Sequence, residues 1–497
     1  MKKIFLLLCG LVLYSCQENV EEIQFKKQNA FSQKVLSISE INKHITSQLK
    51  QKGDMVWKDP LVLWSAAMHG DSILTIGYGK KGQSFAGHKS LELQSLQKKV
   101  LNTISEMENN TEDEVLLNDD AILNVVDVKI SSYATVETLL AKENIRYIEP
   151  NGYSYYQPQN QNGAKQLSGS GCNQEKETVN TEDYKIITPG SLLPWNFSIH
   201  NINKAWEIST GKGVTIGLID TGISNRQSLL NNEFNDGFSN NRKVERFGVF
   251  TDSFWRWRNN PDGPDDKCGH GTDMAGALLA PRNNNNMPVG VAYNSNLVSY
   301  RATEDVIIND FHEKKGVSDA LKRLADRKDV KIISISLGSL FSIGNVKDAV
   351  QYANAKGKLI FAAGGTSTAV TNFVGVTFPA NMKETVAVTG ITDNGKYTKC
   401  RNCHSGKEID FTIVMQRARK GDRVVPVIGF NSNEIQYSGG SSIATAISAG
   451  IAALVWEKNP SWNKDQVLEK LKQSGELFGN KSDRFGYGNI DALKAVD

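Results

Sequence analysis

The chain has 497 residues, of which 39% are hydrophobic and 22% are charged, and its formal net charge is +3. This composition is typical of a globular protein with a sizeable core, and the length corresponds to about three domains. The near balance of charge, without a dense basic run interleaved with aromatic residues, argues against nucleic acid as a partner. Enzyme, adaptor and scaffold all remain compatible with these values.

The N-terminus has the pattern of a bacterial export signal. Two lysines precede an apolar run at 4–13, which is too short to span a bilayer comfortably. The run ends in Leu-Tyr-Ser-Cys, which resembles a lipoprotein signal, in which the cysteine is lipidated and becomes the mature N-terminus. We therefore expect residues 1–15 to be an export signal and Cys16 to carry a lipid that anchors the exported chain at the cell envelope. An ordinary cleaved signal with an incidental cysteine is the alternative.

Export would permit disulfides among the four cysteines beyond the signal region. Cys400 and Cys403, followed by His404, could form half of a zinc site, but no second pair at metal-ligand spacing completes it. A local disulfide is therefore predicted there, with a redox role as a further alternative. Cys172 and Cys268 could pair, although the sequence does not fix the connectivity.

The first half of the chain predicts a spacer, a small domain and a linker. Residues 16–65 are polar and weakly periodic, so we expect a spacer with some helix. Residues 66–155 are predicted to form a small α+β domain with helices on one face of a sheet. Its predicted strands are 72–78, 121–130 and 146–148, and its predicted helices are 91–107 and 135–142. Residues 156–194, rich in Gln, Asn, Gly and Ser, are expected to be a flexible linker.

Strands and helices alternate from 195 to 497. The predicted strands are 214–219, 296–301, 331–337, 359–363 and 385–389. The predicted helices are 272–279, 317–324, 346–355, 442–456 and 464–473. This order predicts an α/β domain with a doubly wound, mostly parallel sheet flanked by helices, which binds ligands beyond the carboxyl ends of its strands.

Three short segments could carry chemistry. Asp220 ends a buried strand, His270 begins a helix between two glycines, and Ser442 begins a long apolar helix whose dipole favours negative charge. Singly, these residues could be a turn cap, a packed surface histidine and a helix N-cap. Together they supply the nucleophile, the base and the orienting carboxylate that acyl transfer requires. Their order, Asp then His then Ser, is that of subtilisin.

The region from about 195 to the C-terminus resembles the subtilisin-like serine peptidases. The motifs I-D-T-G, G-H-G-T-x-x-A-G and G-S-S-x-A match the family's catalytic segments, and 485–491 resembles the segment that closes its catalytic domain. The resemblance implies that Ser442 is the nucleophile, His270 the general base and then acid, and Asp220 the orienting carboxylate. It also implies a polypeptide substrate and no required cofactor. The substrate-binding residues that it assigns are Ser336, Leu337, Gly338, Gly364 and Gly365.

The resemblance extends to the preceding domain and to a calcium loop. Residues 146–151 resemble the end of the family's inhibitory pro-domain, which assists folding and blocks the active site until it is removed. We therefore expect 66–155 to act as an intramolecular inhibitor, with a fixed accessory domain as the alternative. The loop 282–288 lies where many relatives bind calcium as a structural ion, and its asparagine carbonyls suit that ion. An exposed turn is the other reading of this loop.

One departure from the family bears on activity. The family has an asparagine after its Ala-Gly pair, which donates a hydrogen bond to the developing oxyanion, whereas this chain has Gly365. In subtilisin itself the loss of this donor costs about 10²–10³ in turnover. Thr366, Ser367 and Asn372 are close enough in sequence to replace it. An active endopeptidase and a catalytically weak peptide-binding module are therefore both open, and the retention of Asp220 and His270 favours the enzyme.

Overall fold

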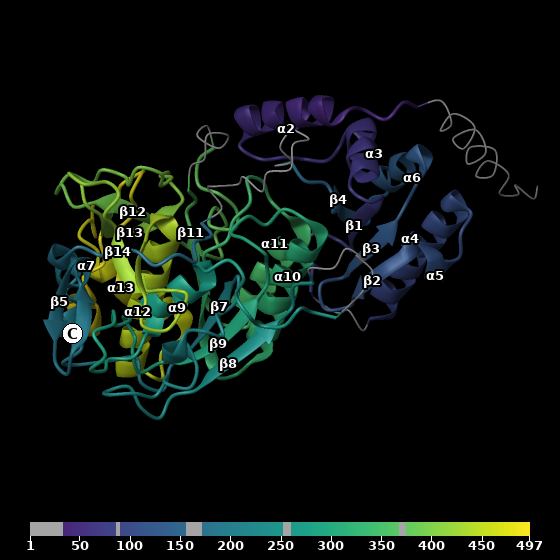
Figure 1. Cartoon of the computed structure of the whole chain (residues 1–497). Helices are drawn as coiled ribbons and strands as arrows, with labels where there is room; N and C mark the ends of the chain where they lie inside the picture. Colours follow the sequence, from purple (N-terminus) through teal and green to yellow (C-terminus); the bar gives the residue numbers. More distant parts are fainter. Residues whose placement is uncertain (1–32, 86–89, 156–170, 252–259, 367–373) are drawn as a thin grey trace, which may run out of the picture.

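The computed structural model describes residues 33–85, 90–155, 171–251, 260–366 and 374–497. Cys16 and the predicted export signal lie outside the described residues. Figure 1 shows a smaller N-terminal domain, in purple and blue, beside helices α10 and α11 of a larger domain. These two helices span Phe311–Asp326 and Gly344–Ala355.

The N-terminal domain is built on a four-stranded antiparallel sheet in the order β2-β3-β1-β4. The strands predicted at the start and end of this domain are found, and so are both predicted helices, with shifts of a few residues at their ends. The strand predicted at 121–130 is shorter, because Asp120 accepts the backbone N–H groups of Ile122 and Leu123 and turns the chain there. The strands are β1 (Ile73–Tyr78), β2 (Leu116–Asp120), β3 (Val125–Lys129) and β4 (Ile145–Pro150); the helices are α4 (Leu91–Glu108), α5 (Glu112–Val115) and α6 (Tyr133–Leu140).

Two further helices lie where the sequence predicted a spacer, and they pack onto this domain. Helix α2 (Ile38–Lys52) begins with a capping box between Ser37 and Glu40. Its buried residues recur every four positions, so one apolar stripe faces the domain while the rest of the helix is polar. Helix α3 (Pro60–His69) follows and is buried over most of its length. The sequence did not reveal this packing, because a stripe of only three residues gives 16–65 a weak periodicity.

The larger domain contains a seven-stranded, fully parallel sheet in the order β13-β12-β11-β10-β7-β9-β8. The strand order reverses between β7 and β10, so the carboxyl ends of these two strands flank a crevice of the kind that binds ligands. The doubly wound α/β fold predicted from the sequence is therefore confirmed. The strands are β7 (Thr215–Asp220), β8 (Val244–Gly248), β9 (Asn296–Arg301), β10 (Val330–Ile335), β11 (Leu359–Ala363), β12 (Val386–Thr392) and β13 (Ile409–Gln416).

Helices cover both faces of this sheet. On one face, Ile216 and Leu218 of β7 pack into a core with α9 (His270–Leu279) and α12 (Gly440–Lys458). On the other face, Ile219 packs into a second core with α10 and α11. Among the described residues one helix, α12, has the length and hydropathy of a membrane span, and 89% of its most apolar stretch is buried inside the protein. Helix α12 is thus the central core helix of the domain.

Short elements complete the domain around this sheet. Each of the two additional ladders is an antiparallel pair, β5 with β6 and β14 with β15. The last two helices pack against α12 and carry the chain to its C-terminus. These elements are η1 (Thr181–Asp183), β5 (Tyr184–Ile187), β6 (Ser191–Pro194), α7 (Trp195–Ile199), α8 (Ile202–Ala205), η2 (Ser228–Leu230), β14 (Val425–Ile428), β15 (Ile435–Ser438), α13 (Lys464–Ser474) and α14 (Ala492–Val496).

The second half of the segment predicted to be a flexible linker, 156–194, belongs to the larger domain. Hairpin β5–β6 lies within it, and the buried carboxylate of Asp183 accepts hydrogen bonds from Arg417 and Arg423. The sequence pattern concealed this because the anchoring partners lie more than 230 residues away. The residues before it, 171–177, form what we call the strap, which runs beside β15.

The last strand of the N-terminal domain, β4, docks on α11. Arg146 pairs with Asp348 of α11 at 2.5 Å, and the hydroxyl of Tyr147 donates to the same carboxylate at 2.9 Å. Glu149 accepts the backbone N–H of Gly344 at 2.9 Å, which caps the start of α11. These contacts are partly buried, and apolar contacts accompany them. Leu340 packs into the core of the N-terminal domain, and Leu123 and Val125 pack into the core that contains α10 and α11. The interface between the two domains is therefore both polar and apolar.

Candidate active site

Asp220 and His270 meet at the carboxyl end of strand β7. The Nδ1 atom of His270 lies 2.7 Å from Oδ1 of Asp220, and the two residues are 5% and 0% exposed. The same carboxylate oxygen accepts the backbone N–H of Thr221 at 2.8 Å. A buried carboxylate on Nδ1 fixes the imidazole with its other nitrogen, Nε2, available to a reacting group.

A second aspartate, Asp266, fixes the helix that carries His270. Its carboxylate accepts hydrogen bonds from the hydroxyl groups of Thr221 and Thr272 at 2.9 and 2.7 Å. It also accepts three backbone N–H groups at the start of α9, from Cys268, Gly269 and Thr272. Sequence reasoning missed this residue, and the only signal for it is an acidic residue four positions before the histidine.

The surroundings of His270 shift its pKa upward. Burial alone would lower the pKa of the imidazole, since a charged ring is poorly solvated there, but the negative charge of Asp220 and its hydrogen bond raise it above the usual value. Asp273 and Asp266 add smaller contributions in the same direction. The ring is therefore a stronger proton acceptor than a histidine in water.

Ser442 lies in the first turn of α12, whose backbone N–H groups have no partner within the helix. Its hydroxyl donates to the backbone oxygen of Ser336 at 3.5 Å, and the hydroxyl of Ser336 donates to the backbone oxygen of Ser442 at 3.1 Å. Ser442 and His270 line the same groove. The three residues predicted from the sequence are thus brought to one edge of the sheet.

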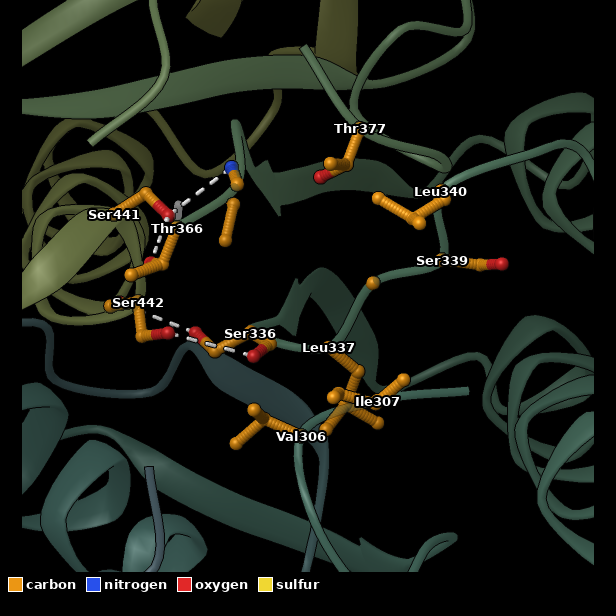
Figure 2. A pocket seen from close by; sticks show the side chains of 13 residues that line it. Val306, Ile307, Ser336, Leu337, Ser339, Leu340, Thr366, Thr377, Ser441 and Ser442 are labelled. Atoms are coloured by element: carbon orange, nitrogen blue, oxygen red, sulfur yellow. Dashed lines mark hydrogen bonds between the residues drawn. The ribbon is translucent and has the colours of Figure 1, made fainter. Parts of the chain in front are cut away.

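A small cavity of about 80 Å³ opens beside Ser442, between the chain that follows β10 and the chain that follows β11 (Figure 2). Four of the five residues predicted to bind substrate line it, namely Ser336, Leu337, Gly338 and Gly365. Gly364 does not line it, and a Cβ there would stand 2.8 Å from the side chain of Ile409 in β13. Residues that the sequence did not indicate complete the lining: Val306, Ile307, Ser339, Leu340, Ala363, Thr366, Thr377 and Ser441.

The family model of the subtilases, peptidase family S8, matches residues 211–488, which is more than half of the chain. The chain belongs to the subtilase family. Membership assigns it to the serine-type endopeptidases and accounts for the parallel sheet and for the placement of Asp220, His270 and Ser442 on β7, α9 and α12.

Individual relatives agree with this assignment. Alkaline elastase YaB from Bacillus sp. (strain YaB) is 30% identical over 322 residues, which cover 63% of this chain and 73% of that protein. Subtilisin from Bacillus sp. (strain TA39) is 27% identical over 308 residues, which cover 58% and 67% of the two chains. Fervidolysin from Fervidobacterium pennivorans, a keratinolytic enzyme related to subtilisin, has the same fold as this chain. The two structures superpose with a TM-score of 0.58 at 15% sequence identity, and the match covers 86% of this chain and 60% of the fervidolysin chain.

The strap of this subtilase reaches the histidine. A Cβ added to Gly171 would stand 3.2 Å from Cδ2 of His270, and a Cβ on Gly269 would collide with the backbone oxygen of Asn173. The strap is joined to the residues just before the histidine by a disulfide between Cys172 and Cys268. A second disulfide joins Cys400 and Cys403, as the sequence indicated. The strap therefore forms one wall of the groove that His270 and Ser442 line.

The loop 282–288, for which a calcium site and an exposed turn were both open, uses some of its side chains within the protein. Asn283 is fully buried, and its amide nitrogen donates to Asp236 at 2.8 Å. The side-chain oxygen of Asn285 accepts the backbone N–H of Met287 at 3.1 Å. Calcium takes six to eight oxygen ligands, and within the described part of the chain no group of three or more His, Cys, Asp or Glu residues is placed to hold a metal. Calcium binding by the asparagine carbonyls of this loop stays a prediction.

Proposed function

We propose that this subtilase cleaves internal peptide bonds with Asp220, His270 and Ser442 as its catalytic triad. The observation that carries the proposal is the buried 2.7 Å contact between His270 and Asp220 in the groove that Ser442 lines. A packed surface histidine would not need a buried carboxylate partner, and a peptide-binding module would not need an imidazole with a raised pKa. The proposed reaction is the hydrolysis of peptide bonds, with peptides as substrates.

The reaction follows from the positions of these groups. The Ser442 hydroxyl turns from the Ser336 backbone oxygen toward Nε2 of His270, which takes its proton as the oxygen attacks the peptide carbonyl. Asp220 holds the ring and stabilises the imidazolium. The tetrahedral intermediate then collapses, and His270 returns the proton to the leaving amine. Water repeats the same two steps on the acyl-enzyme and releases the acid.

Labelling with a fluorophosphonate probe tests this proposal. The exported mature protein should react covalently, since the probe captures an activated serine, and Ser442→Ala should lose all labelling. Thr398→Val, at an exposed position that does not line the groove, serves as the matched control and should label like wild type. Mature wild-type protein that fails to label would favour the alternative, a peptide-binding module weakened by the glycine at 365.

We propose further that residues 66–155 form an inhibitory pro-domain and that α2 and α3 belong to the same folding unit. Support comes from β4, whose residues Arg146, Tyr147 and Glu149 contact α11. The next residue to bond the peptidase is Asn151, whose backbone oxygen accepts from the buried ammonium of Lys314 at 2.8 Å. Interfaces between domains of one chain resemble transient protein–protein interfaces, so this one can open once the chain is cut.

We also propose that the protein is exported and anchored by a lipid on Cys16. Two disulfides within the described residues support an oxidising compartment. Incorporation of a labelled fatty acid that disappears in Cys16→Ser tests the anchor, and a soluble, unlabelled wild-type protein would contradict it.

A further inference from the structure

Gly365 leaves the oxyanion without a side-chain donor at the position where the family has asparagine. Its backbone adopts φ +111°, a conformation that favours glycine. A Cβ there would stand 2.6 Å from Oγ1 of Thr377 and 2.7 Å from Nδ1 of His404. No asparagine can occupy this position without rearrangement of both neighbours, so any second side-chain donor comes from another residue. Ser367 and Asn372, two of the residues that could replace it, lie outside the described residues.

Thr366 is the residue that this turn brings to the groove. Its hydroxyl oxygen lies 3.4 Å from that of Ser441, and a Cβ on Gly440 would stand 3.2 Å from it. The hydroxyl therefore lies at the first turn of α12, which includes Ser442 and whose backbone N–H groups have no partner within the helix. Figure 2 shows the Thr366 side chain pointing toward Ser441, on the same side of the cavity as Ser442.

The position of Thr366 is fixed by contacts on both sides. The backbone N–H of Gly365 donates to the hydroxyl of Ser441 at 3.1 Å, and the backbone N–H of His404 donates to the backbone oxygen of Gly365 at 3.0 Å. Thr366 itself pairs with Cys403 in an antiparallel bridge, next to the disulfide of that cysteine. A donor held in this way is preorganised and needs no reorientation during the reaction.

One arrangement of the hydrogen bonds around Ser441 leaves the Thr366 proton free for a ligand. Each hydroxyl has one proton to donate and two lone pairs that accept. Ser441 accepts from Gly365 and can give its own proton to the Thr366 oxygen. The Thr366 proton can then point into the groove, and the chain of donors from Gly365 through Ser441 polarises it.

We propose that the hydroxyl of Thr366, together with the backbone N–H of Ser442, stabilises the oxyanion in place of the missing asparagine. This inference rests on the proposed function, because the oxyanion forms only when Ser442 attacks. As the Ser442 oxygen bonds to the carbonyl carbon, the π electrons move to the carbonyl oxygen and His270 takes the serine proton. The negative oxygen accepts hydrogen bonds from Thr366 and Ser442, and Thr366 forms no covalent bond.

The test compares Thr366→Val, which removes the hydroxyl at nearly constant volume, with Thr366→Ser, which keeps it. We expect Thr366→Val to lower kcat by about 10² with KM little changed, since the donor acts only on the transition state. Thr366→Ser should stay within a few-fold of wild type. A peptide aldehyde, whose adduct with Ser442 carries the same oxyanion, should lose affinity in Thr366→Val in proportion to kcat/KM. Thr398→Val is the control, and the melting temperature of each variant shows whether it has folded.

Each outcome decides between the explanations. Suppose that Thr366→Val is folded and labelled at Ser442 but has an unchanged kcat, or differs from wild type only in a higher KM. Thr366 then only lines the groove and the proposal is wrong, while the proposed triad is unaffected. If kcat falls as much in Thr366→Ser as in Thr366→Val, the methyl or backbone contacts of Thr366 matter rather than its hydroxyl. That result also overturns the proposal. If mature wild type does not label, the proposed function fails, and this inference fails with it.

Discussion

His270 and Asp220 show how a single buried contact sets the chemistry of a residue. Burial would lower the pKa of the imidazole, and the carboxylate 2.7 Å away reverses that effect. A base must be neutral to accept a proton, so activity should rise with pH through a pKa above the ordinary histidine value of about 6.5. The pKa of His270 is raised because the carboxylate of Asp220 stabilises the protonated ring.

We therefore predict that Asp220→Asn lowers kcat by about 10⁴ and moves the acidic limb of the pH profile to lower pH. The amide removes the negative charge that raises the pKa of His270 and no longer holds the ring in the correct tautomer. The measurement is kcat/KM as a function of pH for the mature enzyme, beside wild type. An acidic limb at the same pH in both proteins would mean that another group titrates.

At the scale of elements, the strap and α9 depend on each other. Cys172 and Cys268 are separated by 96 residues, so their disulfide restricts the unfolded chain strongly, whereas Cys400 and Cys403 are only three residues apart. The strap is also bonded to β15, since Glu177 donates its backbone N–H to Ile435 and accepts from Tyr437. The groove wall is thus held at both of its ends.

We predict that Cys172→Ser with Cys268→Ser lowers the free energy of unfolding by about 2–4 kcal/mol. The matched control, Cys400→Ser with Cys403→Ser, should lose less free energy of unfolding, because the disulfide that it removes closes a much shorter loop. Denaturant unfolding in a Ser442→Ala background measures both without self-digestion, and limited proteolysis should cut 171–177 only in the first variant. Equal losses in the two pairs would show that loop closure does not account for the stability.

At the scale of the whole molecule, one carboxylate takes part in two of the contacts that dock the N-terminal domain. Asp348 accepts from both Arg146 and Tyr147, and the side chains of Arg146 and Asp348 are 8% and 6% exposed. Removing one partner of a buried pair leaves the other charge without compensation, which typically costs about 3–5 kcal/mol. The interface should therefore be sensitive to this one position.

We predict that Asp348→Ala speeds fluorophosphonate labelling of the uncut full chain at least about 10-fold, because the pro-domain dissociates more readily. Lys347→Ala, an exposed neighbour on the same helix, is the matched control and should label like wild type. Labelling is followed over time on protein separated by size, so that uncut and cut chains are distinguished. An unchanged rate in Asp348→Ala would mean that this contact does not contribute to inhibition.

The sequence alone determined the alternation of strands and helices in the larger domain, the parallel sheet, and the order of Asp220, His270 and Ser442. These features are readable because hydrophobic periodicity and short motifs are local. Only the tertiary structure decided the packing of α2, the strap over His270, Asp266 beneath α9 and the place of Thr366. Each of these depends on partners far apart in the chain, such as Cys172 with Cys268 or Thr366 with Ser441, which are brought together only when the sheet and its helices have packed.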